Sequence, residues 1–289
     1  MSFHINANLR EHIGYTFEPL KTQAAAKSFP PPESLSKSVE KWLKKRSGEP
    51  VDLEPENVKL FATAAVDMWL RAVHSFLISA SLTKASPIWS SVGAYYASHY
   101  CVRAFAHLLG HFQSFRVKKI ARLEFDGKRG KCSFRSKQGG DREHQFYWKL
   151  IKEAPSFSAD PLFKNNLEES DSVISEIKHR DLANYCDHLS ALIPKFAPLS
   201  EAILRDRIAF ISSMHFDSPP SPQKGKFPDV EAIQILAYHR IVRFRNFVNE
   251  ALGDSNRFWK VHRNPAWTAG LTNFQLIEQG GIGSISSRS

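Results

Sequence analysis

Two apolar stretches decide the fold class: FATAAVDMWLRAVHSFLISASL at residues 61–82 and IWSSVGAYYASHYCVRAFAHLLGHFQSF at residues 88–115. The first has apolar residues at helical spacing and belongs to a helix predicted from Glu56 to about Leu82. The second is apolar on nearly all sides, so it predicts a helix that is buried on nearly all sides. The turn SLTKASP separates the two stretches. We therefore predict an antiparallel pair of core helices.

Shorter helical segments flank this pair on both sides. Helical spacing predicts them at residues 33–46, 142–154, 170–192, 199–216 and 228–252. The stretch PSFSADPLFKNN, after residue 154, is predicted to be a loop. Between the long pair and the next helix, apolar and polar residues alternate around Asp126-Gly127, which predicts one small β-hairpin within residues 118–137. The predicted fold is mainly α, an antiparallel helical bundle with a basic β-hairpin insertion.

Three regions follow from this reading of the chain. Residues 1–55 form an irregular N-terminal arm with a short helix, and residues 56–265 form the helical domain that contains the hairpin. Residues 266–289 form a C-terminal tail, predicted to be partly disordered because QGGIGSISSRS is rich in Gly and Ser.

The composition is that of a soluble globular protein. The 289 residues are 42% hydrophobic and 24% charged. Cys101, Cys132 and Cys186 are far apart, which favours neither a disulfide framework nor a zinc site and fits a reducing cytoplasm. The first residues carry no apolar run typical of a signal peptide, and residues 61–82 contain charged residues in their interior. We therefore expect a cytoplasmic location and no membrane segment.

The excess of positive charge is concentrated around the predicted hairpin. The chain has 39 Lys and Arg against 29 Asp and Glu, a formal charge of +10, and residues 116–149 contribute +7 of it. Such an excess favours a nucleic-acid partner. The predicted phosphate contacts are Lys118, Lys119, Arg122, Lys128, Arg129, Lys131, Arg135 and Lys137.

Aromatic residues are interleaved with these cations: Phe125, Phe134, Phe146, Tyr147 and Trp148. Exposed rings of this kind stack on bases in single-stranded nucleic-acid binding. The alternative is a solvated hairpin whose aromatic rings pack on the helices beneath it. A second basic strip, HRIVRFRN at residues 239–246, is the next candidate, and its alternative is a solvated or acid-paired helix flank.

Polar residues recur at every fourth position of the second apolar stretch: Tyr95, His99, Arg103, His107 and His111. We call this row the polar seam. Buried Arg and His need partners, so the seam either meets acids inside the protein or lines a wet cleft. Asp67 on the preceding helix is predicted to pair with Arg103. The alternative is an internal network that only fixes the helix register.

Metal and cofactor chemistry has little support in the sequence. His107 and His111 have a zinc-compatible spacing on one helix, but no third ligand follows at a recognisable distance. The Gly pairs at residues 139–140 and 280–281 lack the context of a nucleotide-binding loop, and no GxSxG motif occurs. We therefore expect neither a metal nor a cofactor.

The segments WSSVGAYYASHYCVRAFAHLLG and LSEAILRDRIAFISSMHF resemble the second and last core helices of HEPN domains, over residues 56–115 and 170–216. HEPN domains are all-helical and occur in toxins, CRISPR-associated nucleases and phage-defence proteins. The resemblance implies a metal-independent endoribonuclease that commonly pairs as a homodimer. The signature of that family is Arg followed by His after four to six residues. Here Arg103 and His107 are one residue too close, and Arg257 with His262 has the spacing beyond the core.

The resemblance therefore implies an RNA-acting protein of a toxin or phage-defence system. In the catalytic hypothesis, His99 or His107 is the general acid or base, Arg103 holds the phosphate and Asp67 orients the cluster. The alternative is a non-catalytic nucleic-acid-binding or regulatory subunit of a defence or toxin–antitoxin complex. In either case we expect a homodimer or a partner protein, because the helix at residues 88–115 has more apolar surface than one neighbouring helix covers.

Overall fold

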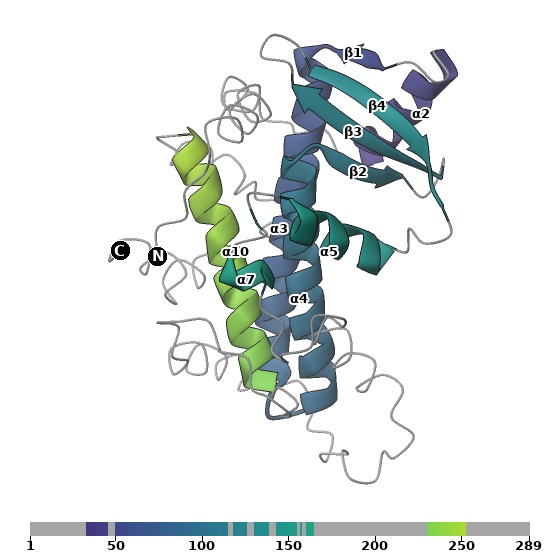
Figure 1. Cartoon of the computed structure of the whole chain (residues 1–289). Helices are drawn as coiled ribbons and strands as arrows, with labels where there is room; N and C mark the ends of the chain where they lie inside the picture. The colour runs from purple at the N-terminus through teal and green to yellow at the C-terminus, as the bar shows by residue number, and fades with distance from the viewer. Residues whose placement is uncertain are drawn as a thin grey trace. The chain divides into compact units, whose positions relative to one another are not determined.

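The computed structural model describes residues 33–45, 50–114, 118–125, 130–138, 143–154, 157, 160–164 and 230–252. Most of these residues are helical. The helices are α2 (Glu33–Lys45), α3 (Pro55–Leu82), α4 (Pro87–Leu108), α5 (Glu143–Glu153), α7 (Pro161–Lys164) and α10 (Val230–Leu252) (Figure 1). The strands are β1 (Val51–Leu53), β2 (His111–Ser114), β3 (Lys119–Phe125) and β4 (Gly130–Ser136).

These elements belong to two compact units, which are described separately below. The sheet unit contains the described residues up to Trp69, those from Val102 to Asp160, and those from Phe244 onward. The helical unit contains Leu70–Cys101 and the described residues from Pro161 to Arg243. The boundary falls inside α3, α4 and α10, so each of these three helices contributes a segment to both units.

The sheet unit is built around a four-stranded antiparallel sheet with the order β1-β4-β3-β2. The predicted hairpin is confirmed as β3 and β4. The prediction that it stands alone is wrong, because β2 pairs with β3 and β1 pairs with β4. Both additional strands are edge strands of three or four residues, which is too short to show an alternating pattern in the sequence.

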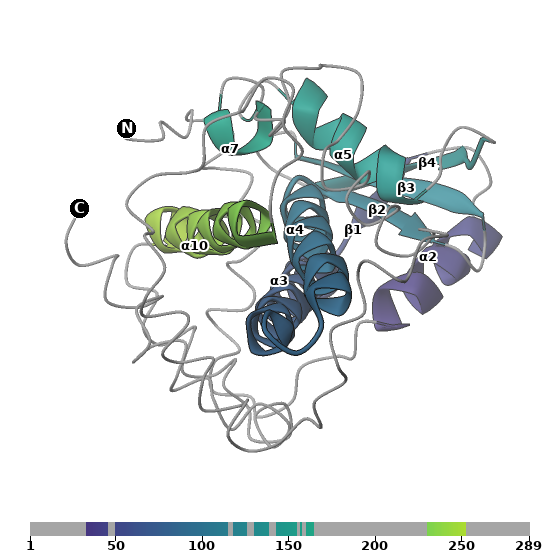
Figure 2. The same cartoon turned by 90° about the horizontal axis from the view of Figure 1, so that it is seen from below.

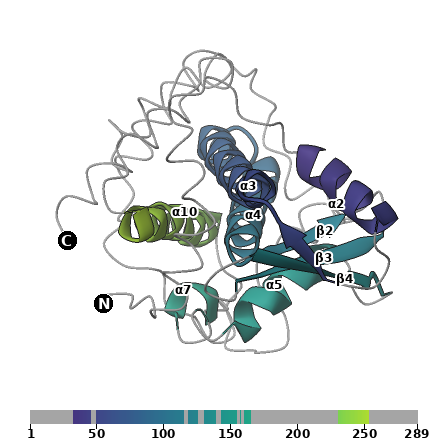
Figure 3. The same cartoon turned by 90° about the horizontal axis from the view of Figure 1, so that it is seen from above.

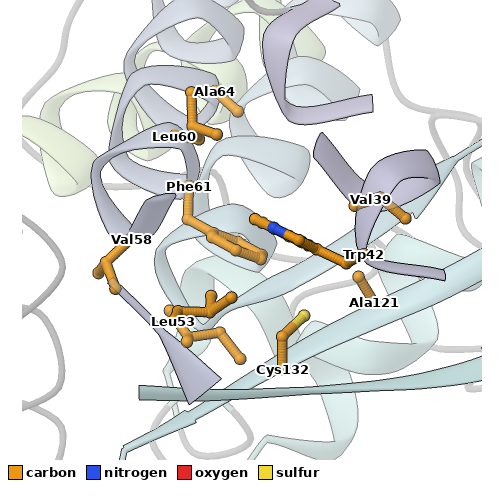
Figure 4. Close-up of a cluster of buried hydrophobic side chains, with 10 residues drawn as sticks. Val39, Trp42, Leu53, Val58, Leu60, Phe61, Ala64, Ala121 and Cys132 are labelled. Atoms are coloured by element: carbon orange, nitrogen blue, oxygen red, sulfur yellow. The ribbon is translucent and has the colours of Figure 1, made fainter. Parts of the chain in front are cut away.

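One face of the sheet packs on α2 and the first turns of α3. Strand residues alternate between faces, so Leu123 of β3 and Cys132 of β4 point to this side. Figure 4 shows Phe61 of α3, Trp42 of α2 and Cys132 reaching into the same buried cluster. Burial raises the pKa of the Cys132 thiol to about 12, so it behaves as a small apolar side chain. Figure 3 shows α5 on the opposite face of the sheet.

The helical unit is an antiparallel pair made by the end of α3 and the start of α4, with α10 beside it (Figure 2). The Ser79 hydroxyl donates to the Ser90 carbonyl at 2.7 Å, and the Ser90 hydroxyl donates to the Ser79 carbonyl at 2.8 Å. From α10, Nε2 of Gln234 lies 2.8–2.9 Å from the hydroxyl oxygens of Ser79, Thr83 and Ser90. Because the three hydroxyl protons go to backbone carbonyls, the three oxygens are acceptors that share the two N–H groups of the amide. This network joins three helices through buried groups.

Replacing Gln234 by leucine is expected to lower the stability of the protein by about 1–3 kcal/mol, because the hydroxyl oxygens of buried Ser79 and Ser90 and of half-buried Thr83 then lose the two N–H donors that they share. Urea unfolding followed by circular dichroism measures this loss. Glu231→Leu places the same side chain at an exposed position of α10 and is expected to change stability by less than about 0.5 kcal/mol. Equal stabilities of the two variants would show that the network contributes nothing.

The other helices agree with the sequence prediction, with two corrections. Helices α2, α3, α5 and α10 lie where they were predicted. Helix α4 ends at Leu108 and not near Phe115, because Gly110 takes a φ of 79° and starts the turn into β2. Helix α7 lies in a stretch predicted to be a loop. The predicted helices at residues 170–192 and 199–216, the C-terminal tail and the Arg257–His262 pair lie outside the described residues.

One segment, Leu60–Leu82, is long and apolar enough to cross a membrane by length and composition alone. Most of its side chains are buried within the protein, as in the core helix of a soluble domain. The described structure is consistent with a soluble protein.

Candidate nucleic-acid interface

The cations of the hairpin lie at two places that differ in charge. In the first, Lys131 of β4 stands directly opposite Asp52 of β1 and Glu124 of β3, and all three side chains are exposed. Arg122 reaches Glu124 at 3.1 Å. An exposed ion pair of this kind adds little stability, but it offsets positive charge. The charges of the described residues in this part of the sheet therefore nearly cancel.

The second place is the end of the hairpin at which β3 begins and β4 finishes. Its described residues include four cations: Lys118, Lys119, Arg135 and Lys137. The backbone N–H of Lys137 donates to the Lys118 carbonyl at 2.9 Å, and Lys119 Nζ donates to the Ser136 hydroxyl at 2.9 Å. These bonds join the start of β3 to the end of β4. We call them the basic end.

Two further features concern the geometry of the basic end. Lys118 has a φ of 50°, a left-handed conformation that costs a non-glycine residue about 1–2 kcal/mol. The guanidinium of Arg135 lies 5.8 Å from the ring centroid of Phe146 in α5. The ring supports the cation while the side chain of Arg135 stays exposed. Lys128 and Arg129, also predicted as contacts, lie outside the described residues.

The predicted stacking surface is not present in the described aromatic residues. Tyr147 and Trp148 are buried, Phe146 is half-buried, and Phe134 packs against the cluster between the sheet and α2. The side chain of Phe125 lies outside the description. The prediction that Tyr147 and Trp148 stack on bases is therefore wrong, because both rings are part of the core. The part of the prediction that stays open is contact between the cations and phosphate.

The second basic strip, on α10, is also partly interior. Arg240 is fully buried in the helical unit, where its Nε donates to the Leu162 carbonyl at 2.9 Å. Its guanidinium lies 5.9 Å from the ring centroid of Phe163. His239 and Arg243 are half-buried, and Asn246 is exposed. The strip therefore borders the core, and Arg240 is not available to a nucleic acid.

The polar seam does not run along one helix, because His111 lies on strand β2 and not on α4. The backbone N–H of Leu123 donates to the Gly110 carbonyl, so residues 110 and 123 form a hydrogen-bonded pair of the antiparallel ladder. Such pairs alternate along the ladder, so the backbone N–H and C=O groups of residues 111 and 113 point away from β3, toward the open edge of the sheet. Nδ1 of His107 donates to the His111 carbonyl at 2.8 Å. The Tyr147 hydroxyl accepts from the Gln113 N–H at 3.0 Å. Side chains of α4 and α5 thus form hydrogen bonds with backbone groups of the edge strand β2. These bonds protect that edge from pairing with another chain.

This contact fixes the chemistry of His107. A carbonyl only accepts hydrogen bonds, so Nδ1 carries the proton of the neutral ring. The side chain is 1% exposed. Burial, followed by the charge of Arg103, lowers the pKa of His107 to about 3, although the bond to His111 opposes the shift. His107 is therefore neutral near pH 7 and is enclosed in the protein.

The other predicted catalytic residues lie in different surroundings. Arg103 is half-buried, and its guanidinium lies 5.1 Å from the ring centroid of Tyr147. Asp67 is buried in the same unit, and the predicted ion pair between Asp67 and Arg103 stays a prediction. His99 is buried in the helical unit, where its ring stacks on Tyr95 at 5.8 Å. The structure places Arg103 and His107 against the same ring, that of Tyr147. His107 and Tyr147 are buried and Arg103 is half-buried, as in a packing contact inside the protein.

Sequence reasoning missed the role of Tyr147 and of Gln113. A tyrosine at that position of α5 fits the pattern of any amphipathic helix. Its partner is the backbone N–H of Gln113, and a backbone group cannot be recognised from the residue type. The described residues contain no group of three or more His, Cys, Asp or Glu that could hold a metal ion. Cys101 and Cys132 are buried thiols, and burial raises the pKa of both, so neither is an activated nucleophile.

Fold and site together describe a mainly α-helical protein with a small antiparallel sheet that carries a compact group of cations at one end. Comparison of the chain with protein-family models, with curated proteins and with solved structures gave no match.

Proposed function

We propose that this protein is a non-catalytic RNA-binding module that contacts the phosphate backbone through the basic end, Lys118, Lys119, Arg135 and Lys137. The observation that carries the proposal is the charge of this group. The described residues 118–121 and 135–138 include four cations and no acid, whereas the neighbouring part of the sheet is nearly neutral. Phosphate neutralisation by such cations supplies most of the affinity in sequence-independent binding.

The geometry also favours binding over catalysis. General acid–base chemistry near pH 7 requires a group that titrates there and reaches the substrate. His107 is neutral well below that pH and is enclosed, with its Nδ1 proton committed to a backbone carbonyl. The endoribonuclease activity, the HEPN fold, the homodimer and the cytoplasmic location stay predictions.

Reversing three cations of the basic end, in the variant K118E/R135E/K137E, is expected to weaken RNA binding by about tenfold or more at low salt. The salt dependence should also become shallower, by roughly one unit of slope for each lost phosphate contact. Fluorescence anisotropy of a labelled RNA at several salt concentrations measures both effects.

The matched control is K37E/K41E/K44E, which changes the charge equally on three exposed lysines of α2 in the same unit. A small effect of the control together with a large effect of the first variant supports a local contact. Equal losses would show that only net charge matters. Cleavage of the RNA that disappears in His107→Ala while the protein stays folded would instead support the ribonuclease.

A further inference from the structure

Strand β4 is longer than its outer neighbour β1. It runs over seven residues, Gly130–Ser136, whereas β1 has three residues and pairs only with Gly130–Cys132. From Ser133 to Ser136, β4 therefore pairs with β3 on one side and with no described strand on the other. We call residues 133–136 the open segment of β4. An unpaired strand edge of this kind can accept a strand from another chain.

The backbone groups of Phe134 and Ser136 point to the unpaired side of the open segment. The Lys137 N–H donates to the Lys118 carbonyl, so residues 118 and 137 form a hydrogen-bonded pair of the antiparallel ladder. Such pairs alternate, so the N–H and C=O groups of residues 134 and 136 point away from β3. The Ser136 carbonyl accepts from Nη1 of Arg135 at 3.3 Å, and no described residue bonds with the outward groups of Phe134.

The open segment differs in this respect from the edge at β2. There the side chains of His107 and Tyr147 cap the backbone groups of the strand. The open segment keeps N–H donors and C=O acceptors at strand spacing, which is the pattern that an extended peptide backbone complements. A sugar–phosphate backbone has no N–H groups for the carbonyls. The ligand that this edge fits is therefore a peptide in strand conformation.

The side chain of Phe134 indicates one residue of such a peptide. Phe134 points to the α2 face of the sheet, as Cys132 does, and it is half-buried where it packs against the buried cluster. Val51 of β1 is half-buried against the same cluster. In an added strand, the residue directly opposite Phe134 has its Cβ about 4.5–5.5 Å away, on the same face. An apolar side chain there would cover the exposed part of the Phe134 ring.

The side chain of Lys119 indicates a second residue. Nζ of Lys119 lies 2.9 Å from the Ser136 hydroxyl, so the ammonium reaches from β3 across to β4. No described carboxylate pairs with Lys119. A carboxylate opposite Ser136 on an added strand would lie within reach of this ammonium. In a strand antiparallel to β4, that residue precedes the one opposite Phe134 by two positions. The complementary sequence is therefore an acid, any residue and then an apolar residue.

A second copy of the open segment does not meet this requirement. Residues 133–138 contain no Asp or Glu, so a paired copy offers Lys119 no carboxylate. Antiparallel pairing of two such segments with Ser136 opposite Ser136 would also bring two Lys119 ammonium groups together, and like charges on facing strands are destabilising. The lysine thus disfavours the symmetric contact and favours an acidic partner.

We infer that the open segment of β4 binds an extended segment of a partner protein by antiparallel strand addition, with an acid opposite Ser136 and an apolar residue opposite Phe134. The inference does not rest on the proposed function, because the backbone groups of β4 carry it. Lys119 belongs to both sites, so the experiment has to separate peptide binding from RNA binding.

The test is a selection on the full-length chain of displayed peptides of about eight residues, within the usual length of a strand. We expect enriched peptides to contain an acid two residues before an apolar residue. Their affinity should fall by about tenfold or more in Ser136→Pro, which removes an outward N–H, and by at most about threefold in Ser136→Ala, which keeps it. Because the Ser136 N–H does not pair with β3, the proline variant is expected to keep the melting temperature of the parent.

Two measurements on the peptide do not depend on the folding of Ser136→Pro. N-methylation at the apolar residue should abolish binding to the parent, whereas N-methylation at the residue before it should not, because that N–H points away from β4. Replacing the acid by its amide should weaken binding to the parent by about threefold, and it should have no effect in Lys119→Gln.

Three results would overturn the inference. The first is a selection that enriches no peptide on the parent, or peptides that tolerate N-methylation equally at both positions. The second is a set of peptides that bind the folded Ser136→Pro variant like the parent but are lost in K118E/R135E/K137E, because charge alone would then hold them. The third is a uridine oligonucleotide that displaces the peptides from the parent and no longer binds folded Ser136→Pro, because the open segment would then serve a nucleic acid.

Discussion

Replacing Gly110 by alanine is expected to destabilise the sheet unit by about 3 kcal/mol or more. Gly110 has a φ of 79°, which an alanine adopts only at a cost, and a Cβ there would meet the Leu123 carbonyl oxygen at 2.6 Å and the Leu123 Cβ at 2.8 Å. The Gly110 carbonyl also accepts from the Leu123 N–H at 2.8 Å, so the residue that a Cβ would displace is the one hydrogen-bonded to Gly110, next to the pairing of β2 with β3. Urea unfolding of the variant measures the loss.

Gly93→Ala is the control for this prediction. A Cβ at Gly93 meets its nearest neighbour, the Cβ of Ser79, at 3.1 Å, and alanine improves the helix propensity of α4 at that position. Its effect is therefore expected to be much smaller than that of Gly110→Ala. If both variants lose the same stability, the turn at Gly110 does not depend on a glycine.

Gly110 also explains why the sequence predicted too long a helix. An isolated glycine inside an apolar helical pattern is often tolerated, and the residues after it, HFQSF, continue the apolar content of α4. The information that ends the helix is tertiary, because β2 exists only through its pairing with β3. The same holds for β1, whose three residues Val51–Leu53 pair with β4 about 80 residues later in the chain. Local periodicity detected the long helices and the β3–β4 hairpin, whose partners are near in sequence.

In the candidate site, too, local features were predictable from the sequence and tertiary contacts were not. The sequence located the cations of the hairpin correctly in one segment, but it did not show that Asp52 and Glu124 face Lys131 while the basic end faces no described acid in its own two strands. In the polar seam, the spacing of His99, Arg103 and His107 was visible, but their burial was not. For Arg103 and His107, burial depends on what α5 brings to the end of α4, and Tyr147 lies 40 residues after His107.

Lowering the pH from 6.5 to 5 is expected to cost the protein about 2 kcal/mol of stability through His107 alone. The pKa of His107 is about 3 in the folded protein and about 6.5 in the unfolded chain, because burial and the charge of Arg103 oppose protonation. Between these two values the unfolded chain holds the extra proton, so stability falls as the pH falls from 6.5 toward 3. Well above pH 6.5 both states are neutral and the contribution of His107 to the pH dependence vanishes.

The variant His107→Gln isolates this effect, because an amide N–H retains a donor for the His111 carbonyl but does not titrate. Its stability at pH 7.5 is expected to drop, and the measured quantity is the slope between pH 6.5 and 5, which should be shallower than in the parent. His74→Gln removes an exposed histidine and is expected to keep the parent slope. Arg103 and the imidazole of His111 stay in place in both variants, so they do not account for a difference between the slopes. A parent-like slope in His107→Gln would mean that His107 is not held neutral in the folded protein, and the edge of β2 would then lack the cap that we assign to it.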